Sequence, residues 1–141
     1  MIDTSVFLNI LDLPGRNQDR QQVLDSFQAY IQNEDTLLLP YAVIIETGNF
    51  VGQTSGNRRF DFAQKFTSIM VKCLEGNLPW KPLRIPQKQE LLSWLSDFPR
   101  SASRGLGFAD FSMVQELYLQ RELFPQYEVQ IWSLDQHLQG Y

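Results

Sequence analysis

The sequence contains only one cysteine, Cys73, among its 141 residues. A single cysteine excludes an internal disulfide and a zinc site built from cysteines. No apolar run approaches the ~20 residues that cross a bilayer, so we expect no membrane partner. The first residues lack a basic segment followed by an apolar run and a small-residue cleavage site. We therefore expect no Sec-type export signal, and a cytoplasmic location.

Motifs of several catalytic classes are also missing. There is no Gly-rich phosphate loop ending in Lys-Ser or Lys-Thr. There is no Gly-x-Ser-x-Gly elbow, and a Ser-His-Asp hydrolase would have to use His137, the only histidine. We interpret His137 as a surface or packing residue. Phosphatases of the haloacid dehalogenase type need a second Asp two residues after the first, and Ser5 occupies that place after Asp3.

Positive charge is in short supply, since the formal net charge is −4. This sign is wrong for a protein that holds nucleic acid by bulk electrostatics alone. It does not exclude a nuclease whose metal ions neutralise an acidic pocket locally. Among the unevenly placed basic residues, Arg100 and Arg104 are candidates for phosphate contacts, and a solvated surface is the equal alternative.

What is present indicates one globular domain over residues 1–141, because hydrophobic residues make up 43% of the chain. Short apolar runs alternate with amphipathic segments, which predicts an α/β fold of three layers, α/β/α, with a short central parallel sheet. The expected helices are 17–32, 41–51, 57–74, 87–98 and 106–122. The expected strands are a very short one within 1–10 that runs into a turn, then 36–39, 82–85 and 127–131, and 99–105 is an expected loop.

Four acidic residues stand at the ends of apolar runs, where packing explains them least. They are Asp3, Glu46, Asp110 and Asp135. Carboxylates are costly to bury without compensation, and a divalent cation with oxygen ligands would supply it. Ligands collect outside the carboxyl ends of parallel strands, so one edge of the sheet is the expected meeting point. Each acid also has a structural alternative, such as a helix cap for Asp3 or a first-turn acid for Asp110.

Four pieces of the sequence, in this order, resemble the PIN domain family, and within it the small toxin-like ribonucleases of toxin–antitoxin pairs. The pieces span the whole chain: Asp3-Thr4-Ser5-Val6-Phe7-Leu8, Val43-Ile44-Ile45-Glu46, Arg104-Gly105-Leu106-Gly107-Phe108-Ala109-Asp110 and Ile131-Trp132-Ser133-Leu134-Asp135-Gln136-His137-Leu138. Only Met1 and Ile2 precede the first acid, where the family has several apolar residues. The stretch 54–104 is also long for the most compact members.

The resemblance implies a PIN-like ribonuclease that uses Mg²⁺ or Mn²⁺. Carried over by residue, Asp3, Glu46, Asp110 and Asp135 would form the catalytic acidic site. Asp3, Asp110 and Asp135 would be the metal ligands, and Glu46 would orient the attacking water or act as an outer ligand. Thr4, Ser5 and Ser133 match the family's hydroxyl positions, with plain capping as the alternative. The implied partners are an RNA substrate, a second copy in a homodimer and a small antitoxin. The alternatives are a catalytically inactive PIN-like binding module and a nuclease that prefers DNA or flap structures.

Overall fold

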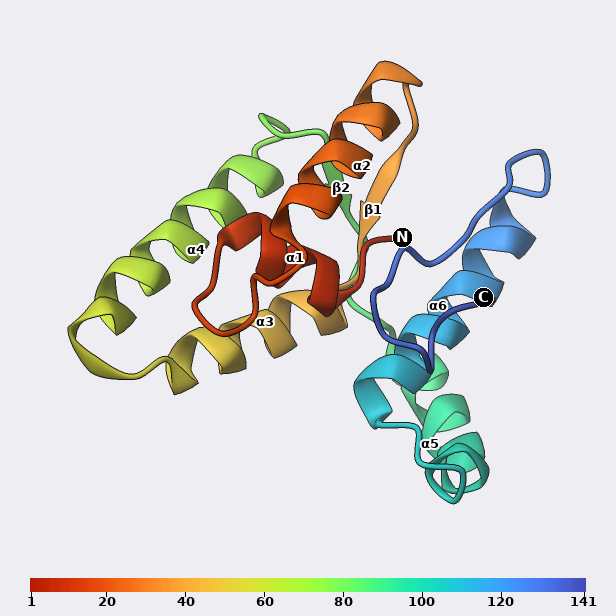
Figure 1. The fold of residues 1–141 in the computed structure, drawn as a ribbon. Helices are drawn as coiled ribbons and strands as arrows, with labels where there is room; N and C mark the ends of the chain where they lie inside the picture. Colours follow the sequence, from red (N-terminus) through yellow and green to blue (C-terminus); the bar gives the residue numbers. More distant parts are fainter.

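The fold is helix-rich α/β, and the computed structural model describes all residues from Met1 to Tyr141. The elements, in chain order, are α1 (Thr4–Leu11), α2 (Arg20–Gln32), β1 (Leu37–Leu39), α3 (Tyr41–Gln53), a 3₁₀ turn η1 (Gly56–Arg58), α4 (Arg59–Leu74), β2 (Trp80–Pro82), α5 (Lys88–Ala102) and α6 (Phe108–Leu123). In Figure 1, α1 and α4 lie on one side of the strands, and α5 and α6 lie on the other. None of these helices combines the length and the apolar character that a membrane span requires.

The strands are very short and run in parallel. β1 pairs with β2, with Leu37 opposite Trp80 and Leu39 opposite Pro82. On its other edge β1 meets the first residues of the chain, because the Ile2 N–H donates to the Leu38 carbonyl over 2.9 Å. A parallel bridge then joins Ile2 to Trp132. The two strands and two short extended segments thus lie side by side, in the order β2, β1, 1–3 and 131–133.

Local sequence accounts for the short length of β1. Three leucines form it, and Leu37 and Leu39 are buried on the core side. Pro40 follows directly, has no N–H for a ladder and starts α3 with extended backbone angles. The chain therefore passes at once from strand to helix, which places α3 beside the carboxyl end of the strands.

The core lies between the strands and the helices that cover them. Its most deeply buried side chains include Phe7 of α1, Leu39 of β1, Val43 of α3 and Leu117 of α6, all fully enclosed. Phe7 packs edge-on against Trp80, with ring centroids 5.3 Å apart. Because each layer contributes to one cluster, the helices and strands are fixed relative to one another at the edge where the acids lie.

The long helices were predicted correctly to within a few residues, but several predictions for short segments were wrong. Residues 1–10 do not form a strand and a turn, because Thr4–Leu11 is a helix. Asp3 accepts the N–H of Ser5 as its cap, and the apolar residues of the helix face the core.

Three further predictions fail near the end of a helix or strand. The predicted loop 99–105 is helical as far as Ala102, because Pro99 lies on the exposed side and costs a single hydrogen bond there. The second strand is Trp80–Pro82 rather than 82–85, since Trp80 is the buried residue that pairs with β1. Residues 127–131 form no strand, since only Trp132 bridges to another segment.

Candidate acidic site

Asp3 is buried at the point where the first extended residues enter α1, and only 3% of it is exposed. Its Oδ2 atom accepts three hydrogen bonds. Ser5 donates from its backbone N–H over 3.1 Å and from its Oγ over 2.5 Å, and Ser133 donates from its Oγ over 2.8 Å. Asp3 is therefore both the cap of α1 and the link between two ends of the chain that are 130 positions apart. Asp3 is thus a helix cap, as the structural alternative proposed, and it also contacts the segment that carries Asp135.

The same hydroxyls position the segment that carries Asp135. Ser5 Oγ accepts the N–H of Leu134 over 3.0 Å, and Ser133 Oγ accepts the N–H of Asp135 over 2.9 Å. Asp135 itself is exposed, and its Oδ1 accepts the N–H of His137 over 2.8 Å. Each serine thus donates to a buried carboxylate and accepts from the backbone, so each hydroxyl is used both as a donor and as an acceptor.

Glu46 joins this group through the residue next to Asp3. Thr4 Oγ1 donates to Glu46 Oε2 over 2.6 Å, which ties the start of α1 to the second turn of α3. Glu46 is half-buried on the helix that begins directly after β1. All three hydroxyl residues noted in the sequence therefore contact an acid of the predicted set.

Asp110 lies in the first turn of α6 and is half-buried. Burial, and after it the negative charges of Glu46, Asp3 and Asp135, raise the pKa of Asp110 from its ordinary 3.8 to about 6. A charge affects a pKa strongly only at short range, so Asp110 completes a cluster of four acids. Asp110 also fits its structural alternative, because the N-terminus of a helix favours a carboxylate in the first turn.

His137 has an effect on the acids that its interpretation as a surface residue does not include. It is exposed, as expected for a surface histidine, but its positive charge lowers the pKa of Asp110 against the effect of the three acids. The signal in the sequence was its position two residues after Asp135. His137 is thus close enough to the acids to act on the pKa of Asp110.

Arg100 and Arg104 are not part of this electrostatic group. Arg100 lies in the last turn of α5 and Arg104 in the turn that follows, and both are exposed. Neither makes a salt bridge, and neither is among the charges that shift the pKa of Asp110. Their contact with phosphate stays a prediction.

The oxygen atoms of these residues are of the kind that a hard divalent cation binds, but they do not form a coordination shell for one. Carboxylates and hydroxyls are the oxygen ligands that Mg²⁺ and Mn²⁺ prefer, and the mutual repulsion felt by Asp110 is what a cation would relieve. No group of three or more His, Cys, Asp or Glu side chains is arranged to hold an ion. Asp3 and Glu46 are instead held by hydroxyls. The ligand roles of Asp3, Asp110 and Asp135 stay a prediction.

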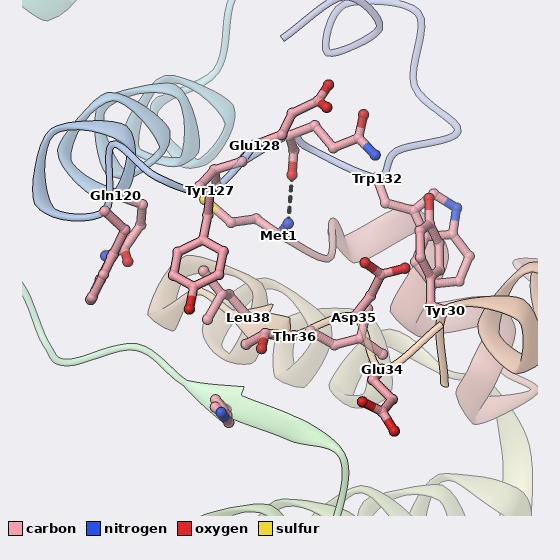
Figure 2. Close-up of a pocket in the computed structure, with 15 residues that line it drawn as sticks. Met1, Tyr30, Glu34, Asp35, Thr36, Leu38, Gln120, Tyr127, Glu128 and Trp132 are labelled. Atoms are coloured by element: carbon pink, nitrogen blue, oxygen red, sulfur yellow. Dashed lines mark hydrogen bonds between the residues drawn. The ribbon is translucent and has the colours of Figure 1, made fainter. Parts of the chain in front are cut away.

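A cavity of the molecule lies away from the four acids. It has a volume of about 480 Å³, and none of the four acids lines it (Figure 2).

Comparison of the chain with family models, curated proteins and solved structures found no match. The acid cluster therefore has to be interpreted from its own chemistry.

Proposed function

We propose that this chain is a Mg²⁺- or Mn²⁺-dependent endoribonuclease of PIN-like fold that hydrolyses phosphodiester bonds of RNA. The observation that supports this most is the meeting of four carboxylates from distant parts of the chain, with the pKa of Asp110 raised to about 6 by burial and by the other three. Repulsion between these carboxylates destabilises the folded state. Carboxylates with pKa values shifted in this way are typical of functional sites.

The three-layer α/β/α arrangement is part of this proposal. Its support is the parallel order of β2, β1, 1–3 and 131–133, with α1 and α4 on one side and α5 and α6 on the other (Figure 1). Asp3 follows one of these extended segments directly, and Asp135 comes just after another. The acids thus lie at the carboxyl ends of the strands, where ligands bind in parallel sheets.

Each protein group has a defined task in this proposal. Asp3, Asp110 and Asp135 supply the negative charge that holds a divalent cation, and Ser5 and Ser133 fix the Asp3 carboxylate in one orientation. Thr4 holds Glu46, which orients the attacking water. A bound Mg²⁺ or Mn²⁺ would lower the pKa of that water and neutralise charge on the scissile phosphate. His137, which lies two residues after Asp135 and acts on the pKa of Asp110, stands at the edge of the cluster, where an RNA phosphate would approach.

RNA cleavage with and without metal tests the proposal. We expect wild-type protein to cut single-stranded RNA with Mn²⁺ or Mg²⁺ and to stop when EDTA is added. Asp110→Asn should slow cleavage by about a hundredfold or more, because it removes a ligand charge. Asp97→Asn is the matched control, since Asp97 is exposed on α5 and has no effect on the pKa of Asp110. Equal rates for wild type and Asp110→Asn would refute the assignment.

One observation favours a second candidate, a PIN-like module that binds RNA without turnover. As placed, no three acidic or imidazole side chains form a ligand set for a cation. EDTA-independent RNA binding with no cleavage at any metal concentration would select this candidate. Including double-stranded and flap-containing DNA in the same assay separates a ribonuclease from a nuclease that prefers those substrates.

Two protein partners belong to the proposal. A homodimer is supported by exposed leucines on α5, of which Leu92 is 51% and Leu95 is 55% exposed. A small antitoxin follows from the toxin-like resemblance alone. Co-expression with the product of the neighbouring reading frame tests it, because an antitoxin should co-purify with this chain and suppress RNA cleavage.

A further inference from the structure

Basic residues gather around the turn between α3 and α4 and along α4. Residues 47–74 contain a single acid, Asp61, in a chain whose formal net charge is −4. The basic residues of this stretch are Arg58, Arg59, Lys65 and Lys72. In Figure 1 the turn between α3 and α4 lies at the far left, away from α5 and α6. This part of the molecule is therefore positive relative to the rest of the chain.

Arg16, in the loop after α1, adds a further cation beside α3. Its guanidinium carbon lies 4.6 Å from the centre of the Phe50 ring. Such a contact with an aromatic ring holds the charge in place without using its N–H groups. No hydrogen bond or salt bridge within the chain uses this exposed guanidinium. Arg16 is thus a positioned cation whose donors are free.

Arg59 is held at the carboxyl end of α3. Its Nε donates to the Thr54 carbonyl over 2.9 Å, and Thr54 Oγ1 donates to the Phe50 carbonyl over 3.3 Å. The two Nη groups of Arg59 have no partner in the chain, and neither has the exposed side chain of Arg58. A guanidinium that is fixed through Nε and free at both Nη atoms can bind two oxygens of one phosphate.

These contacts continue from the acid cluster along one side of α3. Glu46 of the cluster and Phe50 are four residues apart in α3, and Thr54 follows four residues later as the C-cap. Residues with this spacing lie on the same side of a helix, ~6 Å apart along its axis. Phe50 makes the contact with Arg16, and Thr54 makes the contact with Arg59. A strand that leaves the cluster along α3 would meet one arginine after the other.

An exposed aromatic ring lies directly after the two arginines of the turn. Phe60, in the first turn of α4, is 69% exposed. Aromatic rings on which bases stack, combined with cations that contact phosphates, are typical of sites for single-stranded nucleic acids. The bases of a duplex are stacked on one another and are not free to use such a ring.

We propose that single-stranded RNA binds along this side of α3, from the acid cluster to the turn between α3 and α4. Arg16, Arg58 and Arg59 contact phosphates of the strand, and a base stacks on Phe60. Charge identifies the occupant, because cations without partners in the chain complement a polyanion. This inference rests on the proposed action on RNA, and it names the residues that hold the strand while the acid cluster acts on it.

Fluorescence anisotropy with a labelled single-stranded RNA of about 12 nucleotides and mixed sequence tests the binding, with EDTA present to prevent hydrolysis. Arg16→Gln and Arg59→Gln should each weaken binding about fivefold at about 50 mM salt and reduce the slope of log affinity against log salt by ~0.7. Arg58→Gln should do the same, and it removes no contact within the chain that could unfold the protein. Phe60→Ala should weaken binding of the single strand about tenfold and leave duplex RNA binding unchanged.

Lys88→Gln is the matched control, because it removes one exposed, unpaired cation at the start of α5 and should change neither affinity nor slope. The proposal is overturned if the wild type does not bind RNA at low salt, or if the arginine variants bind it as the wild type does. Competition by polyglutamate as strong as that by unlabelled RNA would also overturn it, since the surface would then accept an acidic polypeptide.

The binding assay contains no divalent cation, so its result is independent of hydrolysis. RNA that binds through these arginines but is not cut with Mn²⁺ would refute the ribonuclease and leave this inference standing. Metal-dependent cleavage that is unchanged in all three arginine variants, together with unchanged binding, would have the opposite meaning.

Discussion

Hydroxyl donors explain how a carboxylate can be buried at the start of α1. Asp3 accepts from both Ser5 and Ser133, and each serine also accepts a backbone N–H from the segment 134–135. Buried polar groups are tolerated when they are satisfied in this way. Asp110 differs, because no side chain donates a hydrogen bond to its carboxylate, and burial and three negative charges act on it with only His137 in opposition. The two acids of one cluster therefore have opposite effects on stability.

Asp110→Asn is expected to stabilise the metal-free protein at neutral pH. The folded-state pKa of Asp110 is raised to about 6, above its ordinary 3.8. The folded state thus holds this proton more tightly than the unfolded state, and wild-type stability falls as pH rises from about 4 to about 6. Because the side chain is half exposed, we expect a gain of only about 1 kcal/mol for the Asn variant above pH 6.

Urea unfolding of both proteins between pH 4 and pH 8, with EDTA present, measures this effect. The stability difference should grow with pH and level off above about pH 6. Asp97→Asn, which replaces an exposed acid of α5, should show no such pH dependence. A less stable Asn variant at pH 7.5 would mean that the macrodipole of α6 outweighs burial and repulsion at Asp110.

The helices and strands show which features could be predicted from the sequence. The long amphipathic helices were predicted because their apolar residues recur over three or more turns. The helix Thr4–Leu11 was missed although its N-cap, Asp3, and its apolar residues are visible in the sequence. The alternation at 127–131 predicts a strand, but the Val129 carbonyl accepts from Arg121 Nε of α6 instead of from a neighbouring strand. Short segments depend on tertiary contacts that periodicity does not contain.

Helix α5 carries the prediction about self-association. Leu92 and Leu95 lie three positions apart on one exposed side of the helix, and both side chains are about half exposed. Leu95→Glu should raise the dimer dissociation constant by about tenfold or more, because a two-fold interface contains the change twice. Ser96→Glu alters an exposed neighbour on the same helix and is the matched control.

Sedimentation equilibrium across a range of concentrations gives these dissociation constants. Thermal melts should show that both variants keep the wild-type fold, since neither position is buried. A monomeric wild type, or a dissociation constant that Leu95→Glu does not change, would remove α5 from the dimer proposal.

At the scale of the whole molecule, two edges of one short parallel arrangement have different characters. At the carboxyl edge the charges of Glu46, Asp3 and Asp135 act on Asp110, at the place where the sequence analysis expected these acids to meet. The amino edge holds a cavity of about 480 Å³, which no motif indicated, because it depends on two segments that lie about 90 positions apart in the chain and flank residues 1–3. Positions that share an edge can be deduced from topology, whereas the side-chain geometry of the acids cannot.

Metal binding is the property that acts on the whole fold. If the acid cluster holds a divalent cation, Mn²⁺ or Mg²⁺ at about ten times its dissociation constant should stabilise the folded state by about 1.4 kcal/mol, or roughly 3–5 °C in melting temperature. The shift should be larger at pH 7.5 than at pH 5.5, because the cation competes with the proton that the raised pKa of Asp110 retains. Asp110→Asn should reduce the shift, and Asp97→Asn should not. A sodium salt of equal ionic strength controls for screening. A melting temperature that stays constant through a millimolar Mn²⁺ titration would contradict a metal centre at these acids and, with it, the proposed hydrolysis of RNA.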